Sequence, residues 1–157
     1  MHKQEVVIRE AEQADIIQLV NMASEYIKES ERWKSIPFNP TRSVMNALIA
    51  LDDPNQKIVV AFKGCMLVGF MWSFISCTIW SDVTICQDRF LYVHPDHRDY
   101  KISSGLLDFI VEWAKDKGAN AIHVGANSGI KEDKPAIWFY RSHGFKPIGI
   151  NLYKEIL

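Results

Sequence analysis

The stretch from residue 83 to residue 126 constrains the fold most, because strand and helix patterns alternate within it. Residues 83–93 have the pattern of a strand, residues 102–114 carry apolar side chains at helical spacing, and residues 121–126 have a second strand pattern. Two such strands joined by one helix are expected to pair in parallel, with a right-handed crossover. We therefore expect a mixed α/β protein with a parallel pair in its sheet.

The rest of the chain supplies further strand and helix patterns. The other predicted strands are residues 6–8, 57–62, 65–75 and 147–156. The other predicted helices are residues 16–27, 40–51 and 135–143. Lys63-Gly64 predicts a hairpin turn, while Gly118 and Gly144 are expected to end helices. The order βααβββαβαβ, without a repeat or linker, predicts one domain over residues 1–157.

Residues 64–81 carry no charged side chain, and a run of this length can form a transmembrane helix. Glycine, serine and threonine interrupt the run, and a predicted turn precedes it, so we expect a long buried strand and no membrane partner. The N-terminus is too polar to begin a secretory signal. The three cysteines contain no C-x-x-C pair, which indicates a reducing compartment and a cytoplasmic protein.

The charge balance disfavours nucleic acid as a partner. The chain has 18 basic and 19 acidic residues, for a formal net charge of −1. Proteins that coat nucleic acid need an excess of lysine and arginine, and no basic stripe occurs here. His94 and His97 lack cysteine or clustered carboxylates at zinc spacing, so we expect no metal site.

The junction Leu91–Ser104 carries the strongest indication of a ligand site. A strand ends there in a short polar loop that opens a helix, and such loops expose several unpaired backbone N–H groups. Arg98 and Lys101 add positive charge, which Asp96 and Asp99 partly offset. A phosphate-sized anion site and a capped loop without a ligand both fit this pattern.

A second segment, near the C-terminus, carries another motif that is considered together with this loop. The matching positions of the loop and its helix are Val93, Pro95, Arg98, Leu106 and Leu107. The matching positions of the later segment are Asp133, Ala136, Phe139, Tyr140, Gly144 and Phe145. In this order and spacing the two segments resemble the coenzyme and C-terminal motifs of the GNAT superfamily of acetyl-CoA-dependent N-acetyltransferases. Lys101 and Ser103 stand where that family usually has glycine, and Asp133 stands where it has asparagine.

The resemblance implies a single GNAT-type α/β domain, with a central mixed β-sheet flanked by helices. It implies transfer of an acetyl group from acetyl-CoA to a primary amine, by direct attack in a ternary complex. The acceptor is a small molecule or a protein, and a homodimer is left open. The alternative is a GNAT-fold binding or regulatory module with weakened catalysis. The residues implied to bind the coenzyme are Leu91, Val93, Arg98, Asp99, Tyr100, Lys101, Ile102, Ser103, Ser104 and Asp133.

Two side chains are the candidate catalytic residues. A lysine-type amine has a pKa of about 10.4, so a base must take its proton. The base in this family is often a carboxylate on the fourth strand, and Asp88 lies there, on one face with Phe90 and Tyr92 by strand alternation. A solvated carboxylate beside Arg89 is the alternative. Tyr140 matches the tyrosine that protonates the departing thiolate, and packing on the core is its alternative.

The acceptor pocket is expected to involve the loop at residues 29–39. Trp33 and Phe38 are candidates to wall it. Three other tryptophan and phenylalanine residues, Trp72, Phe74 and Trp80, are expected in the core. The carboxylates on the first predicted helix and the loop that favour a cationic amine are Glu25, Glu29 and Glu31.

Overall fold

The computed structural model describes residues 5–130 and 134–156. Short 3-10 turns at Gln13–Asp15 and Pro95–His97 lead into α1 and α3. The other elements are β1 (Val6–Glu10), α1 (Ile16–Glu29), α2 (Pro40–Asp52), β2 (Gln56–Lys63), β3 (Met66–Thr78), β4 (Ser81–Val93), α3 (Tyr100–Asp116), β5 (Ala121–His123) and α4 (Lys134–Ser142).

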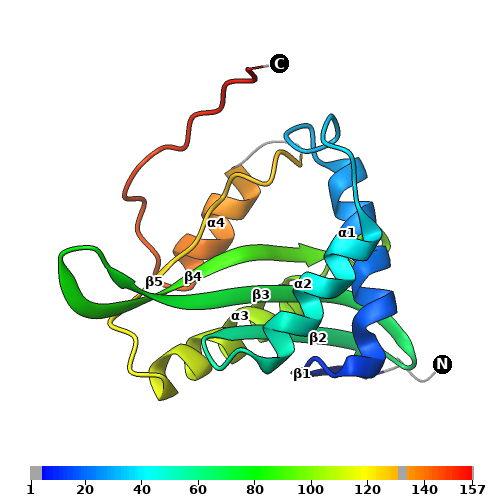
Figure 1. Cartoon of the computed structure of the whole chain (residues 1–157), viewed down its shortest axis with the longest axis horizontal. Coiled ribbons are helices and arrows are strands. Elements are labelled where there is room, and N and C mark those ends of the chain that lie inside the picture. Colours follow the sequence, from blue (N-terminus) through cyan, green and yellow to red (C-terminus); the bar gives the residue numbers. More distant parts are fainter. Residues whose placement is uncertain (1–4, 131–133, 157) are drawn as a thin grey trace.

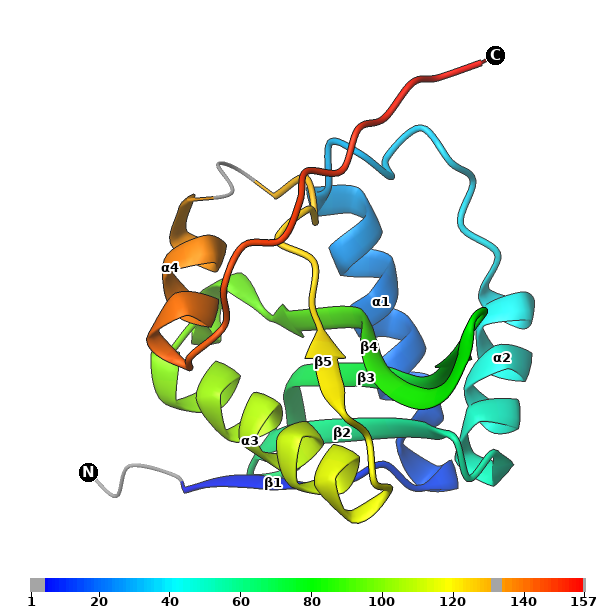
Figure 2. The same cartoon turned by 90° about the vertical axis from the view of Figure 1, so that its left-hand side faces the viewer.

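The strands form one five-stranded sheet in the order β1-β2-β3-β4-β5. Neighbours from β1 to β4 pair antiparallel, whereas β4 pairs with β5 in parallel. This confirms the mixed sheet and the parallel pair that the strand–helix–strand pattern predicted. Helices α1 and α2 cover one face of the sheet, and α3 and α4 lie on the other (Figures 1 and 2).

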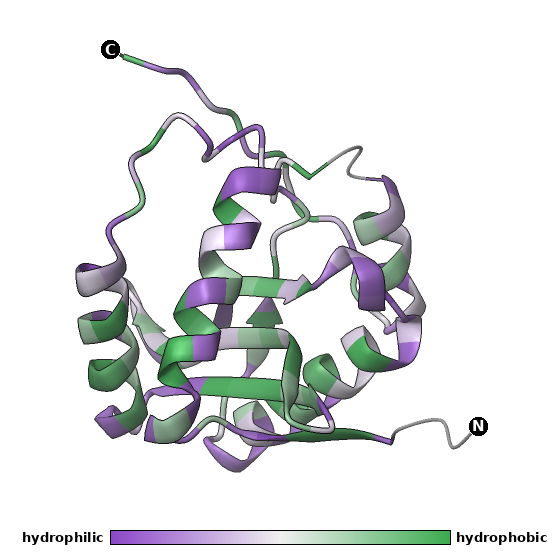
Figure 3. Cartoon of the chain, turned by 90° about the vertical axis from the view of Figure 1, so that its right-hand side faces the viewer, coloured by the Kyte–Doolittle hydropathy of each residue, from purple (hydrophilic) through white to green (hydrophobic). Residues whose placement is uncertain are grey.

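The sheet divides the apolar core into two clusters. On the α1/α2 face, Leu19 packs with Phe70 of β3. On the α3/α4 face, Leu106 and Ile110 pack with Val68 of the same strand. Strand side chains alternate between faces, so β3 supplies both clusters. Apolar colouring runs along strands of the sheet in Figure 3. In the described ranges, no helix combines the length and apolarity that a membrane crossing needs.

Local signals set the helix ends where the sequence predicts them. The Asn39 side chain caps α2 by accepting a hydrogen bond of 2.9 Å from the Arg42 N–H, and Pro40 occupies the first turn. Gly118 and Gly144 follow α3 and α4 with φ of 73° and 85°. Capping chemistry alone therefore predicts these boundaries closely.

Residues 147–156 do not form the predicted last strand. No described strand pairs with them, and in Figure 1 this red segment extends away from the body. Ile150 and Leu152 are 88% and 93% exposed. Alternating apolar residues form a strand only where a sheet edge and an apolar surface receive them, and neither contacts this segment. Trp80, expected in the core, is also exposed, at the β3–β4 turn.

The segment after α1 is fastened to the segment after β5. The buried Ser30 hydroxyl donates to the Ser128 carbonyl, and the Glu31 N–H donates to the Gly129 carbonyl at 2.9 Å. These bonds join residues about a hundred positions apart in the chain and fix the base of the 30–39 loop. The base of this loop is therefore held beside the segment that follows β5.

Gly129→Ala is expected to destabilise the fold by about 3 kcal/mol. Gly129 has φ of +71°, and an added Cβ would lie 2.8 Å from the Arg32 backbone nitrogen. Gly118→Ala is the matched control, because Gly118 has φ of +73° but open space around it. That variant should lose only about 1 kcal/mol, the cost of the left-handed backbone. Urea denaturation of both variants measures the difference, and equal losses would show that the contact with Arg32 is unimportant.

Candidate active site

Strands β4 and β5 separate soon after they meet. They pair only through Ile85–Gln87 and Ala121–His123, while β4 continues to Val93. Beyond Gln87, none of the described strands pairs with this edge of β4. Backbone N–H and C=O groups along such an edge need partners. Leu91 and Val93, which the sequence assigned to coenzyme binding, lie on this stretch.

Asp88 lies at the point where the strands part. Its Oδ1 accepts a hydrogen bond of 3.0 Å from the Gly125 N–H, just after β5. Burial raises the pKa of the Asp88 carboxyl to about 6, and the hydrogen bond from Gly125 opposes part of that rise. A carboxylate with this pKa is ionised at neutral pH and more basic than an exposed aspartate. These properties suit a general base.

A β-bulge places Asp88 on a different face from the one predicted. Trp72 lies opposite Phe90 but Ser73 lies opposite Asp88, so Arg89 is an extra residue in β4. The prediction that Asp88 shares a face with Phe90 was wrong, because simple alternation assumes a ladder without an inserted residue. The Arg89 guanidinium instead lies over the Phe74 ring, 4.4 Å from its centroid.

Tyr140 is held in an aromatic setting on α4. It is buried, and its ring packs against Phe139 and Phe145 with centroid distances of 5.2 and 5.6 Å. Burial raises the pKa of its hydroxyl well above the ordinary value, and the Asp88 charge raises it further. Asp88 and Tyr140 therefore lie within electrostatic range of each other. The hydroxyl stays protonated and makes no hydrogen bond to the residues described.

Arg98 is turned away from the α3 N-terminus. Its Nη2 donates to Glu29 Oε1 at 2.5 Å, and its Nε donates to the Val93 carbonyl at 3.2 Å. The Tyr92 hydroxyl donates to the other oxygen of Glu29 at 2.8 Å. No local sequence pattern indicated this network, because Glu29 lies in α1, far from the loop along the chain.

At the α3 N-terminus, Asp99 takes the capping position. Its Oδ1 accepts a hydrogen bond of 2.9 Å from the Lys101 N–H. Ile102 is buried in the core, Ser103 is partly exposed, and the exposed Lys101 has no ion pair within the described part of the chain. Lys101 is thus the cation that remains available to an anion at this helix end.

Tyr100 and Ser104 contact α4. The Ser104 hydroxyl and His143 Nε2 lie 3.0 Å apart, and the Tyr100 hydroxyl lies 3.0 Å from Ser142 Oγ. These contacts brace the helix that carries Tyr140, and no sequence motif had indicated His143. Asp133, assigned to the coenzyme site, lies outside the described residues.

These groups fit the coenzyme that the sequence motifs imply. The unpaired β4 edge matches the amide groups of a pantetheine chain, and the first turn of α3 with Lys101 matches a pyrophosphate. The Tyr140 hydroxyl, which has no hydrogen-bond partner among the described residues, can donate to a sulfur. The Asp99 carboxylate, which caps α3, opposes an anion at this helix end.

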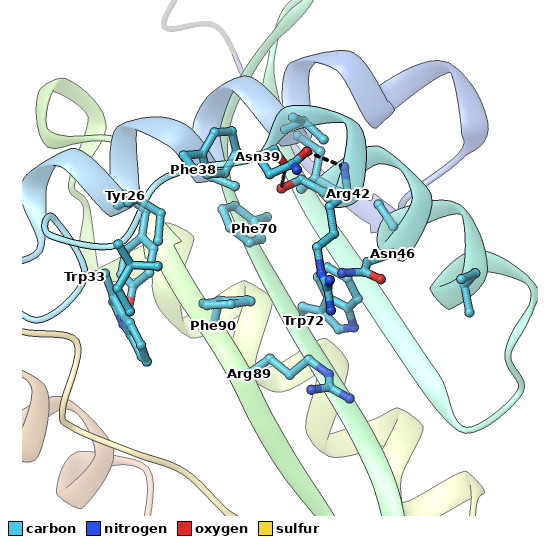
Figure 4. Close-up of a pocket in the computed structure, with 18 of the residues that line it drawn as sticks. Tyr26, Trp33, Phe38, Asn39, Arg42, Asn46, Phe70, Trp72, Arg89 and Phe90 are labelled. Carbon is cyan, nitrogen blue, oxygen red and sulfur yellow. Dashed lines mark hydrogen bonds between the residues drawn. The ribbon is translucent and has the colours of Figure 1, made fainter. Parts of the chain in front are cut away.

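A cavity of about 680 Å³ opens on the α1/α2 face of the sheet (Figure 4). Trp33 and Phe38 wall it, as predicted. Trp72 and Phe74, expected in the core, line it as well, and Asp88 is among its lining residues. Asp88 therefore borders the cavity at the strand separation, although the bulge turns its side chain toward the other face of the sheet.

Comparison with known proteins identifies the family. The sequence profile of the acetyltransferase (GNAT) domain matches residues 52–147. This match spans more than half of the chain, and the chain therefore belongs to the GNAT acetyltransferase family. No curated protein sequence matches it.

Solved structures share the fold along nearly the whole chain. A transcriptional regulator from Bacillus halodurans has a TM-score of 0.79 at 23% identity, covering 97% of this chain and 100% of that one. A predicted acetyltransferase from Clostridium acetobutylicum, solved with acetyl-CoA, has a TM-score of 0.75 at 19% identity, covering 97% of both chains. AAC(6')-Iy, in complex with the bisubstrate analogue CoA-S-monomethyl-acetylneamine, has a TM-score of 0.76 at 13% identity, covering 98% of this chain and 99% of that one.

Proposed function

We propose that this protein transfers an acetyl group from acetyl-CoA to a primary amine by direct attack in a ternary complex. The observation that carries the proposal is that Asp88, beside the unpaired edge of β4, lies near enough to Tyr140 for its charge to raise the pKa of the Tyr140 hydroxyl. The pKa of the Asp88 carboxyl is about 6, whereas that of the Tyr140 hydroxyl lies well above the ordinary value. Two neighbouring groups therefore hold opposite protonation states at neutral pH, as an acid–base pair requires.

Each residue has a defined part in this reaction. Acetyl-CoA supplies the activated acyl group as a thioester. Asp88 accepts a proton from the incoming ammonium group, directly or through water, so that a neutral amine can attack. Backbone N–H groups of β4 near Leu91 and Val93 polarise the carbonyl, and Tyr140 gives its proton to the departing thiolate.

The comparisons support the choice of co-substrate. One structural neighbour was solved with acetyl-CoA and another with a coenzyme A conjugate. A titration with acetyl-CoA tests the proposal, because a ligand of the folded state raises the melting temperature by mass action. Acetyl-CoA should raise the melting temperature, and coenzyme A should be released when an amine is added. Absence of any shift at millimolar acetyl-CoA would contradict the proposal.

A binding or regulatory module is a second candidate, and two observations favour it. Asp99 places a carboxylate at the helix end where a phosphate is expected, and Glu29 engages Arg98. The Asp99 charge repels an anion, and the ion pair with Glu29 occupies an arginine that could otherwise bind one. Both features therefore weaken anion binding at this loop. Coenzyme binding without coenzyme A release across a broad panel of amines would favour this candidate.

Lys101→Ala and Asp99→Asn should change acetyl-CoA affinity in opposite directions. Removing the lysine should raise the dissociation constant about 10-fold, the scale of one charge-assisted hydrogen bond. Asparagine caps a helix as well as aspartate does, so Asp99→Asn removes only the charge and should lower the dissociation constant. Calorimetric titration at two salt concentrations measures both. If neither variant differs from the parent, the pyrophosphate does not bind at this helix end.

A further inference from the structure

The cavity on the α1/α2 face has the size of a small-molecule site. Its volume of about 680 Å³ falls within the range of pockets that hold one small ligand. Asp88 lines it, so a molecule bound there lies next to the proposed base. The inference drawn here rests on the proposed acetyl transfer and concerns the acceptor.

The walls of the cavity are aromatic rather than polar. Trp33 and Phe38 come from the segment after α1, and Phe70, Trp72 and Phe90 come from the sheet (Figure 4). The Trp72 indole N–H is already used, because it donates to Gln56 Oε1 at 2.9 Å. These rings therefore offer apolar faces, and a ligand body that covers them gains the free energy of apolar burial.

The charges around the cavity are mainly positive. Arg42 extends from α2 toward Trp72, and Arg89 lies near the same ring in Figure 4. Neither arginine forms an ion pair with a residue in the ranges 5–130 and 134–156. Asp88 is the one acidic residue among the described lining residues. Two available guanidinium groups favour an anionic group on the ligand.

The acidic residues that favoured a cationic acceptor are engaged elsewhere. Glu25 pairs with Lys28 at 2.9 Å, and Glu31 pairs with Lys34. Glu29 binds Arg98 and Tyr92. None of these three glutamates is among the described residues that line the cavity. The expectation of a cationic acceptor, drawn from their positions in the sequence, therefore loses its support.

We propose that the acceptor is a small primary amine with an aromatic or branched apolar body and one anionic group. The amine lies toward Asp88, the body covers the aromatic walls, and the anionic group binds Arg89 or Arg42. Asp88 and Arg89 both border the cavity, so one small ligand can present its amine to the first and its anionic group to the second. A polycationic, polyhydroxylated aminoglycoside has neither the charge nor the apolar body that this cavity matches.

Three amines test the proposal: L-phenylalanine, 2-phenylethylamine, which lacks the carboxylate, and kanamycin, an aminoglycoside. Coenzyme A release with saturating acetyl-CoA should give a kcat/KM at least about 10-fold higher for phenylalanine than for 2-phenylethylamine, and lowest for kanamycin. Quenching of tryptophan fluorescence by phenylalanine, without acetyl-CoA, should give the same order of affinities. Equal values for the first two amines, a preference for kanamycin, or no binding of phenylalanine at millimolar concentration would overturn the proposal.

Charge-removing variants locate the anion site. Arg42→Gln and Arg89→Gln should each reduce the preference for phenylalanine over 2-phenylethylamine about 10-fold when the residue binds the carboxylate. Both side chains are exposed, so the fold should persist, and melting temperatures check this. Lys115→Gln, on the far side of the sheet in α3, is the matched control and should leave the preference unchanged. A preference that neither arginine variant alters would overturn the assignment of the anion site.

The design separates failure of the acceptor from failure of the reaction. If acetyl-CoA does not bind while phenylalanine still quenches tryptophan fluorescence, the proposed acetyl transfer is wrong and the ligand class stands. If coenzyme A is released faster with 2-phenylethylamine or kanamycin, the acetyl transfer stands and the acceptor class is wrong.

Discussion

Tyr140→Phe should lower kcat by about 10–10³-fold and leave the dissociation constant of acetyl-CoA nearly unchanged. The substitution keeps the ring that packs against Phe139 and Phe145, and removes only the hydroxyl. Burial and the Asp88 charge raise the pKa of that hydroxyl, so it remains protonated throughout an ordinary assay range. The deficit should therefore be the same from pH 6 to about pH 9. Steady-state rates over this range, with a verified amine, measure it.

Phe139→Leu is a control for this experiment. It disturbs the aromatic packing around Tyr140 but keeps the hydroxyl, so it should affect stability more than kcat. Tyr140→Phe should unfold near the parent's melting temperature, because no hydrogen bond within the described structure is lost. A kcat equal to the parent's would assign proton donation to water or another group.

Asp88→Asn should lower kcat/KM on the order of 10²-fold at pH 7, with a deficit that depends on pH. The pKa of the carboxyl is raised to about 6, so the base form is lost as pH falls through 6 and is fully present above it. The parent's rate should rise through that region, whereas the variant's should not. As pH rises toward the amine's own pKa, about 10.4 for a lysine-type amine, the amine loses its proton unaided and the two rates should converge. A pH–rate series on both proteins checks this.

Stability measurements separate the chemical role of Asp88 from a structural one. Asparagine keeps an oxygen that can accept the Gly125 N–H, so the bond across the strand separation is retained. Burial raises the carboxyl pKa above its unfolded value, so the folded state loses stability as pH rises from about 4 through 6. Asp88→Asn should remove that loss and be no less stable than the parent at pH 7. A variant that tracks the parent's rate at every pH would assign the base role elsewhere.

Much of the architecture could be predicted from periodicity and capping. The alternation of strand and helix patterns between residues 83 and 126 predicts the parallel β4–β5 pair, which the structure confirms. Asn39-Pro40 and Gly118 mark helix ends through local chemistry alone. The segment at 147–156 shows the limit of this reasoning, because a strand needs a partner that its own sequence does not specify.

The candidate site was harder to predict, because contacts distant in sequence decide it. The family resemblance implied that residues 88 and 140 act as base and acid, yet only the structure shows that the Asp88 charge raises the pKa of the Tyr140 hydroxyl. The ion pair between Glu29 and Arg98 joins residues 69 positions apart in the chain, and no local pattern indicates it. The bulge at Arg89 changes the face of the neighbouring side chains, which a strict alternation rule cannot anticipate.

The two clusters on opposite faces of the sheet have a consequence for how such a protein diversifies. The cavity is formed by α1, α2, the segment between them and one face of β2, β3 and β4, whereas the proposed coenzyme contacts come from the β4 edge, α3 and α4. Substitutions at distant sites without shared partners contribute independently to the free energies of folding and binding. Single substitutions in the cavity can therefore change which amine is accepted during evolution, while the proposed coenzyme contacts stay the same. Asp88 borders the cavity and also acts on Tyr140, so substitutions at this position are expected to be the least frequent.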